Sequence, residues 1–210
     1  MIMDVFDAIR TRRSHRAFKR NPVEPEKIDR ILEAAHWAPS PANGQPWEFI
    51  IISESAAKEH LVDLSEKARR SGDIELHGFS YIRPLPAGEV GVPEENPAQK
   101  YSISFLKDVP VIIAVVGNPE SPIRQVGPER VRDGYKYACA AAIQNMLLAA
   151  QALGLASLWF TFFDRNLVSR FLNVDPAKHL LALVCIGYPA GVIPVPQRVA
   201  LSAKVRWFEP

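Results

Sequence analysis

The feature that most constrains the fold is an uninterrupted apolar run at residues 109–116, VPVIIAVV. A strand with one face in water alternates apolar and polar residues, whereas a continuous run of this length is typical of a strand buried on both faces. The sheet that holds it must therefore be covered on both sides. With 210 residues, of which 48% are hydrophobic and 23% charged, the chain is long enough to build that core in one globular domain.

The rest of the sequence alternates helical and extended patterns around this strand. A helix is predicted between Pro25 and Pro39, and the longest helix at 135–153, where Gly154 suits the left-handed position after a helix. Further strands are expected at 47–52, 156–163 and 180–186, with a helix after Ser55 and a short helix capped by Asp164. The predicted fold is a single α+β domain over residues 1–210, with a sheet of four or so strands packed between helices.

Two segments fall outside this alternation. Residues 71–104 lose all periodicity and contain several prolines and glycines, which favours a long insertion that acts as a lid docked over the domain; a disordered loop is the alternative. The segment from Tyr188 to Pro210 is rich in proline and is expected to form an extended C-terminal tail.

Composition gives no general reason to expect a nucleic-acid or membrane partner. The formal net charge is +2, and no apolar run approaches the ~20 residues that a membrane-spanning helix needs. Cys139 and Cys185 each lie in an apolar run, as core cysteines of a reduced compartment do. Asp4 and Asp7 interrupt the region where a secretory signal would be apolar, so we expect a cytoplasmic protein. The scattered cysteines and histidines predict no metal site.

The stretch RTRRSHRAF concentrates positive charge directly after a short helical pattern. The guanidinium groups of Arg12, Arg13 and Arg16 match phosphate oxygens in geometry, and the hydroxyl of Ser14 adds a donor. A small phosphorylated ligand would be well held there. A solvated basic surface is an equally good explanation of this stretch alone, and a nucleic-acid patch is a weaker one because it lacks interleaved aromatic residues.

A second polar stretch, APSPANGQPW at 38–47, lies between a predicted helix and a predicted strand. Its prolines fix the backbone, while the side chains of Ser40, Asn43 and Gln45 can bond the donors and acceptors along the edge of a heterocycle. A turn that satisfies its own backbone with those side chains is the alternative. The sequence contains no GxxxxGK, GxGxxG, HExxH or GxSxG signature for other common chemistries.

The two stretches occur in a familiar order, RRSHRAF, then AAHWAPSPANGQPWEFIII, then AIQNMLLAAQALGLASLWF, then IGYP and PQR. This order resembles the nitroreductase family of FMN-dependent enzymes, from about Phe6 to Arg198 and with only the middle insertion unmatched. The resemblance implies a mainly antiparallel sheet of four to five strands flanked by helices. It also implies a homodimer in which two subunits share each flavin site, with the 135–153 helix in the interface.

The resemblance further implies a set of cofactor-binding residues. The flavin phosphate and ribityl chain would be held by Arg12, Arg13, Ser14, Arg16 and Arg198. One side of the isoalloxazine ring would be lined by Pro39, Ser40, Asn43 and Gln45. The backbone of Trp159, Phe160 and Thr161 would pass over its other side. No side chain is expected to act as a catalytic group, because the chemistry occurs at N5 of FMN.

The implied activity is transfer of a hydride from NADH or NADPH to FMN, followed by reduction of a nitroaromatic, a quinone or a related small acceptor in a ping-pong exchange. Residues 154–164 also resemble the dimethylbenzimidazole synthase branch, which consumes its own FMN. Thr161 stands in place of that branch's serine and Ser14 in place of its acidic residue, so we rank this alternative lower. A flavin-binding module without turnover is the other alternative, and the lid of the iodotyrosine deiodinase branch cannot be aligned to 71–104.

Overall fold

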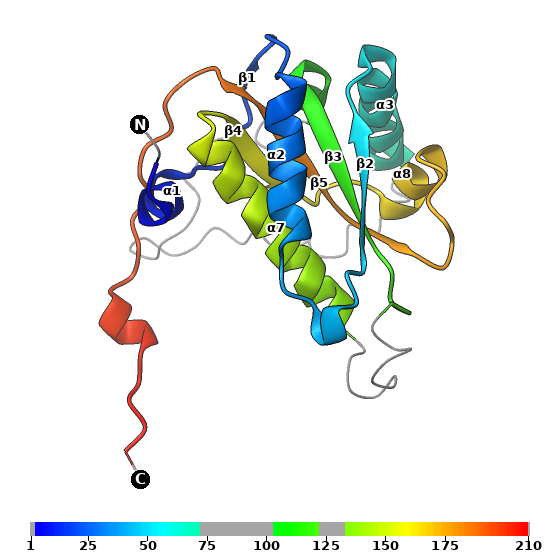
Figure 1. The fold of residues 1–210 in the computed structure, drawn as a ribbon. Coiled ribbons are helices and arrows are strands. Elements are labelled where there is room, and N and C mark those ends of the chain that lie inside the picture. The colour runs from blue at the N-terminus through cyan, green and yellow to red at the C-terminus, as the bar shows by residue number, and fades with distance from the viewer. Residues whose placement is uncertain (1–2, 72–102, 122–132, 210) are drawn as a thin grey trace.

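The computed structural model describes residues 3–71, 103–121 and 133–209. The sheet is entirely antiparallel, and its longest strand, β5 (His179–Pro189), lies between β3 (Val111–Gly117) and β4 (Ala156–Phe160) (Figure 1). β2 (Trp47–Ile52) pairs with the other edge of β3, and β1 (Phe18–Lys19) pairs with the last two residues of β5. The predicted sheet of four to five strands is confirmed.

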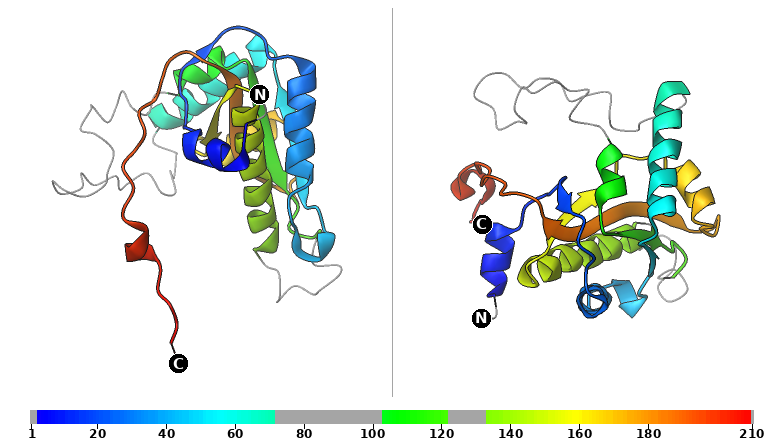
Figure 2. Two further views of the ribbon diagram at one scale, coloured as in Figure 1. Left: turned by 60° about the vertical axis from the view of Figure 1, so that its left-hand side comes forward. Right: turned by 90° about the horizontal axis from the view of Figure 1, so that it is seen from above.

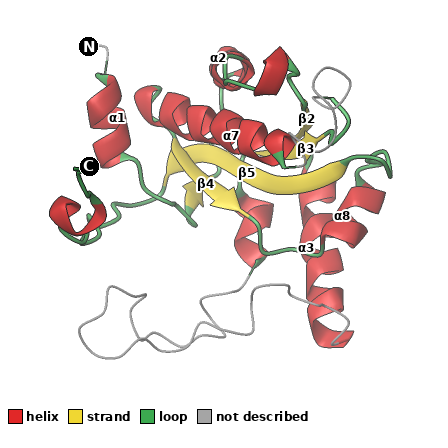
Figure 3. Ribbon diagram, turned by 90° about the horizontal axis from the view of Figure 1, so that it is seen from below, coloured by secondary structure: helices red, strands yellow, loops and turns green. Residues whose placement is uncertain are grey.

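Helices cover both faces of the sheet, as Figure 3 shows edge-on. α2 (Pro25–His36) and α7 (Gly134–Ala152) lie on one face. α3 (Ser55–Ser71), α8 (Arg165–Phe171) and the 3-10 helix η2 (Ser104–Asp108) lie on the other. The short helix α1 (Val5–Thr11) packs against α7 at the side of the molecule.

Strand β3 is buried on both faces, as its continuous apolar sequence predicts. Ile112, Ala114 and Val116 pack with the α3 side, whereas Ile113 and Val115 pack with the α7 side. The strand begins at Val111 and not at Val109, because Val109 ends η2 and Pro110 has no N–H to donate to the sheet. The two sets of side chains divide the hydrophobic core into two layers.

Other boundaries differ from the prediction for local reasons. β4 ends at Phe160 and not at 163, because the chain turns there toward Asp164, whose carboxylate accepts from the N–H of Leu167 at 2.8 Å and caps α8. The proline-rich loop at 39–46 contains a 3-10 turn, η1 (Pro41–Asn43). β5 continues to Pro189, which leaves residues 190–209 as the tail, with one 3-10 turn, η3 (Leu201–Lys204).

The predicted lid at 71–104 lies almost entirely outside the described residues. Within the described part, both cysteines are free and fully buried, as expected for core residues. Burial raises the pKa of the Cys139 thiol to about 12. No helix among residues 3–71, 103–121 and 133–209 is long and apolar enough to cross a membrane.

Candidate functional site

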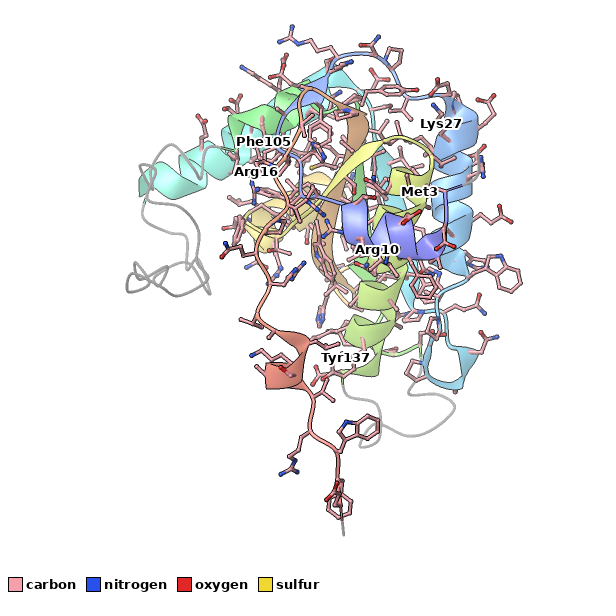
Figure 4. The ribbon with its side chains drawn as sticks, turned by 90° about the vertical axis from the view of Figure 1, so that its left-hand side faces the viewer. Met3, Arg10, Arg16, Lys27, Phe105 and Tyr137 are labelled. Carbon is pink, nitrogen blue, oxygen red and sulfur yellow. The ribbon has the colours of Figure 1, made fainter. Side chains whose placement is uncertain are left out.

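The arginine-rich segment connects α1 to β1 and is fixed to the edge of β4. The N–H of Arg12 closes α1 by donating to the carbonyl of Ala8. Ser14 then forms a parallel bridge with Ser157, and the N–H of His15 donates to the Ser157 carbonyl at 3.0 Å. Because Ser157 pairs with β5 on its other side, the segment lies along the outer edge of β4. Figure 4 views the molecule from the side that carries Arg10 and Arg16.

The cations of this segment crowd together with a residue from the tail. Burial lowers the pKa of Arg12, and the positive charges of Arg13 and Arg198 lower it further. Arg198 is 186 residues from Arg12 in the sequence, so the fold brings together the two ends of the predicted phosphate site. None of Arg12, Arg13, Arg16 and Arg198 forms an ion pair with a carboxylate of the described residues.

Arg13 shows most clearly that this cluster lacks a partner. Its Nη1 donates to the carbonyls of Arg10 and Arg12, both at 2.7 Å. Its Nε is buried and has no hydrogen-bond partner in the described part of the chain. A buried donor without an acceptor costs about 1–3 kcal/mol. The cluster therefore fits an anion with several acceptor oxygens, such as a phosphate group.

The loop after α2 is held in a strained conformation. Ala42, Asn43 and Gln45 have φ values of 50°, 53° and 43°, in the left-handed region that residues with a Cβ seldom adopt. The Ser40 hydroxyl accepts from the N–H of Gln45 at 3.0 Å, and the Ser121 hydroxyl donates to the carbonyl of Gly44. Ser40 thus serves the turn itself, as one of the two alternatives predicts.

The other polar side chains of that loop face solvent. Asn43 and Gln45 are both exposed, as is Pro39, and the side chain of Asn43 makes no hydrogen bond to the residues that the structure describes. The Gln45 amide donates only a long bond of 3.3 Å to the Asn43 carbonyl. The strained backbone thus holds the side-chain amides of Asn43 and Gln45 in solvent, where a ligand can reach them.

The two polar stretches lie at opposite ends of α7 within one chain. Gln151, in the last turn of α7, donates to the Thr11 hydroxyl at 3.1 Å, so the arginine segment is near the C-terminal end of the helix. The loop at 39–46 is near the N-terminal end of α7. There the backbone N–H of Asn118 donates to the Pro46 carbonyl at 2.7 Å, and Tyr135 packs against Gly117. A helix of 19 residues is about 28 Å long. A single chain therefore does not bring these stretches together (Figure 1).

At the end of β4, one of the predicted site residues lies in the core and the others reach the surface. Phe160 is buried and meets Phe105 of η2 edge-on at 5.6 Å, so only its backbone could contact a ligand. Trp159 is 39% exposed, and Thr161 is half-buried just after the strand. Phe105 and Phe162 both flank Phe160. The sequence pattern predicts no role for Phe105, because an isolated phenylalanine is normally a core residue.

Comparison with known proteins agrees with this fold. The model of the nitroreductase family matches residues 9–188. The chain belongs to the nitroreductase family. A Rhodospirillum rubrum 5,6-dimethylbenzimidazole synthase is 27% identical over 207 residues, which cover 97% of this chain and 90% of that protein. A Methanothermobacter thermautotrophicus protein, provisionally named NADH dehydrogenase/NAD(P)H nitroreductase, is 30% identical over 192 residues, 90% of this chain and 78% of that protein.

Solved structures of the family contain the expected cofactor. A Desulfovibrio desulfuricans protein solved in complex with FMN is 25% identical, matches with a TM-score of 0.68 and covers both chains completely. The bound FMN belongs to the structure of that relative. In the chain described here, the unpaired arginine cluster is the observation that fits a phosphate group independently of any relative.

Proposed function

We propose that this protein is an FMN-dependent oxidoreductase. The observation that carries the proposal is the buried Nε of Arg13, which has no hydrogen-bond partner among residues 3–71, 103–121 and 133–209, inside a group of guanidinium groups that no carboxylate of those residues pairs with. A flavin phosphate supplies both the negative charge and the acceptor oxygens that this group lacks. Arg12, Arg13, Arg16 and Arg198, together with the Ser14 hydroxyl, would hold it.

We further propose that the site is completed by a second copy of the chain. The amides of Asn43 and Gln45 would line the ring, but they lie at the far end of α7 from Arg12. A two-fold axis across α7 would place the loop of one copy beside the arginines of the other. α1, the end of α2 and α7 also expose large apolar residues that a partner would cover, namely Val5, Phe6, Ile9, Trp37 and Tyr137.

Bound FMN would accept a hydride from NADH or NADPH and pass the electrons to a nitroaromatic, a quinone or a related acceptor. The residues of this chain would bind and orient it. The cationic cluster would fix the phosphate, and the segment from Trp159 to Thr161 would present backbone N–H groups to the ring. A single open face used in turn by nicotinamide and acceptor would give ping-pong kinetics.

The test is reconstitution with FMN followed by an anaerobic titration with NADH and then NADPH. A bound flavin spectrum that bleaches with the donor and recovers fully when a nitroaromatic is added supports the proposal. Failure to bind FMN would refute it. A bound flavin that neither donor bleaches would instead indicate a binding module.

Readmission of oxygen separates the oxidoreductase from a flavin-consuming enzyme. After reduction, the oxidoreductase returns to its full flavin absorbance in air over many cycles. Progressive loss of that absorbance, with formation of a benzimidazole, would identify the synthase activity instead. The Arg13→Gln variant should bind FMN at least tenfold more weakly, whereas Arg170→Gln, at an exposed position of α8 on the other face of the sheet, should bind it normally.

A further inference from the structure

We propose that Arg13 is a positioning residue that joins the phosphate site to the end of α1, so that binding of a phosphomonoester stabilises this helix. The inference rests on the proposed function, because the anion that it needs is the flavin phosphate. The sequence pattern expects Arg13 to bind phosphate, but neither that pattern nor the comparisons give Arg13 a role toward α1. The added role makes the order of a helix depend on the cofactor.

Helix α1 is held to the rest of the chain by few contacts. It has only seven residues, whereas isolated helices shorter than ~12–15 residues are marginal in water. Of these seven, only Ala8 is buried, while Val5, Phe6 and Ile9 are each more than half exposed. The stability of α1 therefore depends strongly on how its two ends are closed.

The side chain of Arg13 closes the C-terminal end of α1. The last four carbonyls of a helix have no N–H partner within it. Nη1 of Arg13 donates to two of them, the carbonyls of Arg10 and Arg12, each at 2.7 Å. At the N-terminal end, the Asp4 carboxylate accepts from the N–H of Phe6 at 2.6 Å. The guanidinium group of Arg13 is thus part of the end of the helix.

The opposite edge of the same guanidinium group lacks acceptors. Nε and Nη2 lie on that edge and together can bond two oxygens of one anion. Among residues 3–71, 103–121 and 133–209, the buried Nε has no hydrogen-bond partner, and Nη2 makes no hydrogen bond either. A phosphate on this edge leaves Nη1 on both carbonyls. One side chain can therefore serve the end of the helix and the anion at the same time.

An anion on this edge favours the conformation of Arg13 that closes the helix. Without the anion, holding the side chain in place costs rotamer entropy and leaves a buried donor unsatisfied. Because linkage is reciprocal, an anion that binds this conformation better must shift α1 toward its closed, helical form. Cofactor binding thereby fixes the helix whose apolar side chains the second copy of the chain is proposed to cover.

Hydrogen exchange of the full-length protein, measured by rapid mixing and mass spectrometry over residues 5–12, reports the order of α1. Exchange is compared at saturating FMN and at saturating riboflavin, which has the same ring and ribityl chain but no phosphate. Protection common to both flavins comes from the ring and from association of the copies, so the difference between them isolates the phosphate. We expect the α1 amides to exchange about fivefold or more slowly with FMN. The amides of α8, also a seven-residue helix capped by an aspartate, should show no such difference.

Two conservative variants show whether Arg13 carries the effect. Arg13→Lys keeps the positive charge, but a single ammonium group cannot replace both edges of the guanidinium group. The difference between FMN and riboflavin in α1 should therefore disappear. The matched control is Arg10→Lys, because the exposed Arg10 side chain pairs with Asp7 at 3.0 Å and its carbonyl is unchanged. This control should keep the difference, and a difference that persists in Arg13→Lys would overturn the inference.

The outcomes distinguish this inference from the proposed function. If FMN does not bind, the proposed function fails and this inference fails with it. If FMN binds but α1 exchanges equally fast with both flavins, only the role of Arg13 fails. That comparison uses the wild-type protein alone, so it decides the question even if Arg13→Lys does not fold. If riboflavin does not bind, the wild type and Arg13→Lys are compared at saturating FMN, and equal protection of α1 in the two proteins overturns the inference.

Discussion

At the scale of single residues, Gly187 shows how little space the fold leaves where β5 passes the start of β3. A Cβ at this position would lie 2.6 Å from Cδ of Pro110 and 3.1 Å from Cδ1 of Phe18. The ring of Pro110 is rigid, and Phe18 pairs with the neighbouring Pro189, so neither can easily give way. The absence of a side chain at 187 is therefore a packing requirement.

We expect Gly187→Ala to lower the free energy of unfolding by about 1–3 kcal/mol, the usual cost of overpacking a core. Urea unfolding followed by circular dichroism measures the change. The matched control is Gly191→Ala, where nothing lies within 4 Å of the added Cβ, and it should be close to neutral. Equal effects of the two substitutions would show that the contact with Pro110 is not responsible.

At the scale of elements, α3 is tied to the core by a buried lysine. Lys58 is only 6% exposed, and its ammonium group donates to the carbonyls of Val109 at 2.9 Å and Pro110 at 3.3 Å. Burial lowers the pKa of Lys58, because the charged form has lost solvent. The two carbonyls belong to the turn that leads into β3, so this contact positions the helix against the central sheet.

The Lys58→Met variant keeps most of the apolar stem and removes the donor. Leaving a buried carbonyl unpaired should destabilise the protein by about 1–3 kcal/mol, measured as a shift in the urea midpoint. The control is Lys107→Met, at an exposed position in η2. A neutral Lys58→Met would mean that water replaces the ammonium group at both carbonyls.

A second link joins β5 to the start of α2 and depends on pH. The Tyr188 hydroxyl donates to the Glu24 carboxylate, at 2.8 and 2.7 Å from its two oxygens, and Lys27 lies 3.1 Å from the same carboxylate. The hydrogen bond from Tyr188 and the nearby Lys27 lower the pKa of Glu24 to about 2. The carboxylate is thus better stabilised in the folded chain than in the unfolded one.

Because the folded pKa lies below the unfolded value, the stability that Glu24 contributes is fully present above about pH 4.5. It is lost as the pH falls toward 2. The difference in unfolding free energy between the wild type and Glu24→Gln should therefore shrink over this range in urea titrations at fixed ionic strength. A difference that stays constant from pH 6 to pH 3 would contradict the assignment.

At the scale of the whole molecule, the tail passes α1 after β5, and its last part extends away from the body of the protein (Figures 1 and 2). Apart from Ile193, its described residues from 190 to 209 are exposed. They include Val192, Val195, Val199, Leu201, Val205, Trp207 and Phe208. In the proposed homodimer, the partner chain would cover much of this exposed apolar surface.

We expect replacement of both Trp207 and Phe208 by serine to weaken the proposed homodimer by at least about tenfold in Kd, because buried aromatic residues dominate such interfaces. Sedimentation velocity over a range of concentrations measures the change, and FMN affinity should fall in parallel. The control is Ile51→Ser, at an exposed apolar position on β2. A wild-type protein that is monomeric at micromolar concentration would refute the dimer.

Local patterns predicted much of this fold because they report on local requirements. The aromatic and β-branched residues of β2 indicate a strand, the apolar run of β3 indicates burial on both faces, and Asp164 caps α8 as its position predicts. The left-handed conformations of Ala42 and Gln45 could not be predicted, because these residue types seldom adopt them unless the surrounding chain imposes them. The inward position of Phe160 depends likewise on the partner strand.

The sequence by itself determined the order of elements, the doubly buried central strand and the two polar stretches, since periodicity and residue chemistry are properties of the chain alone. The family resemblance implied that Arg198 joins Arg12, but only the tertiary structure brought the two together and left Arg13 Nε without a partner among the described residues. Only the tertiary structure placed the loop at 39–46 at the far end of α7 from the arginines. Distances between segments remote in sequence are decided by how helices and strands pack, and no local pattern encodes them.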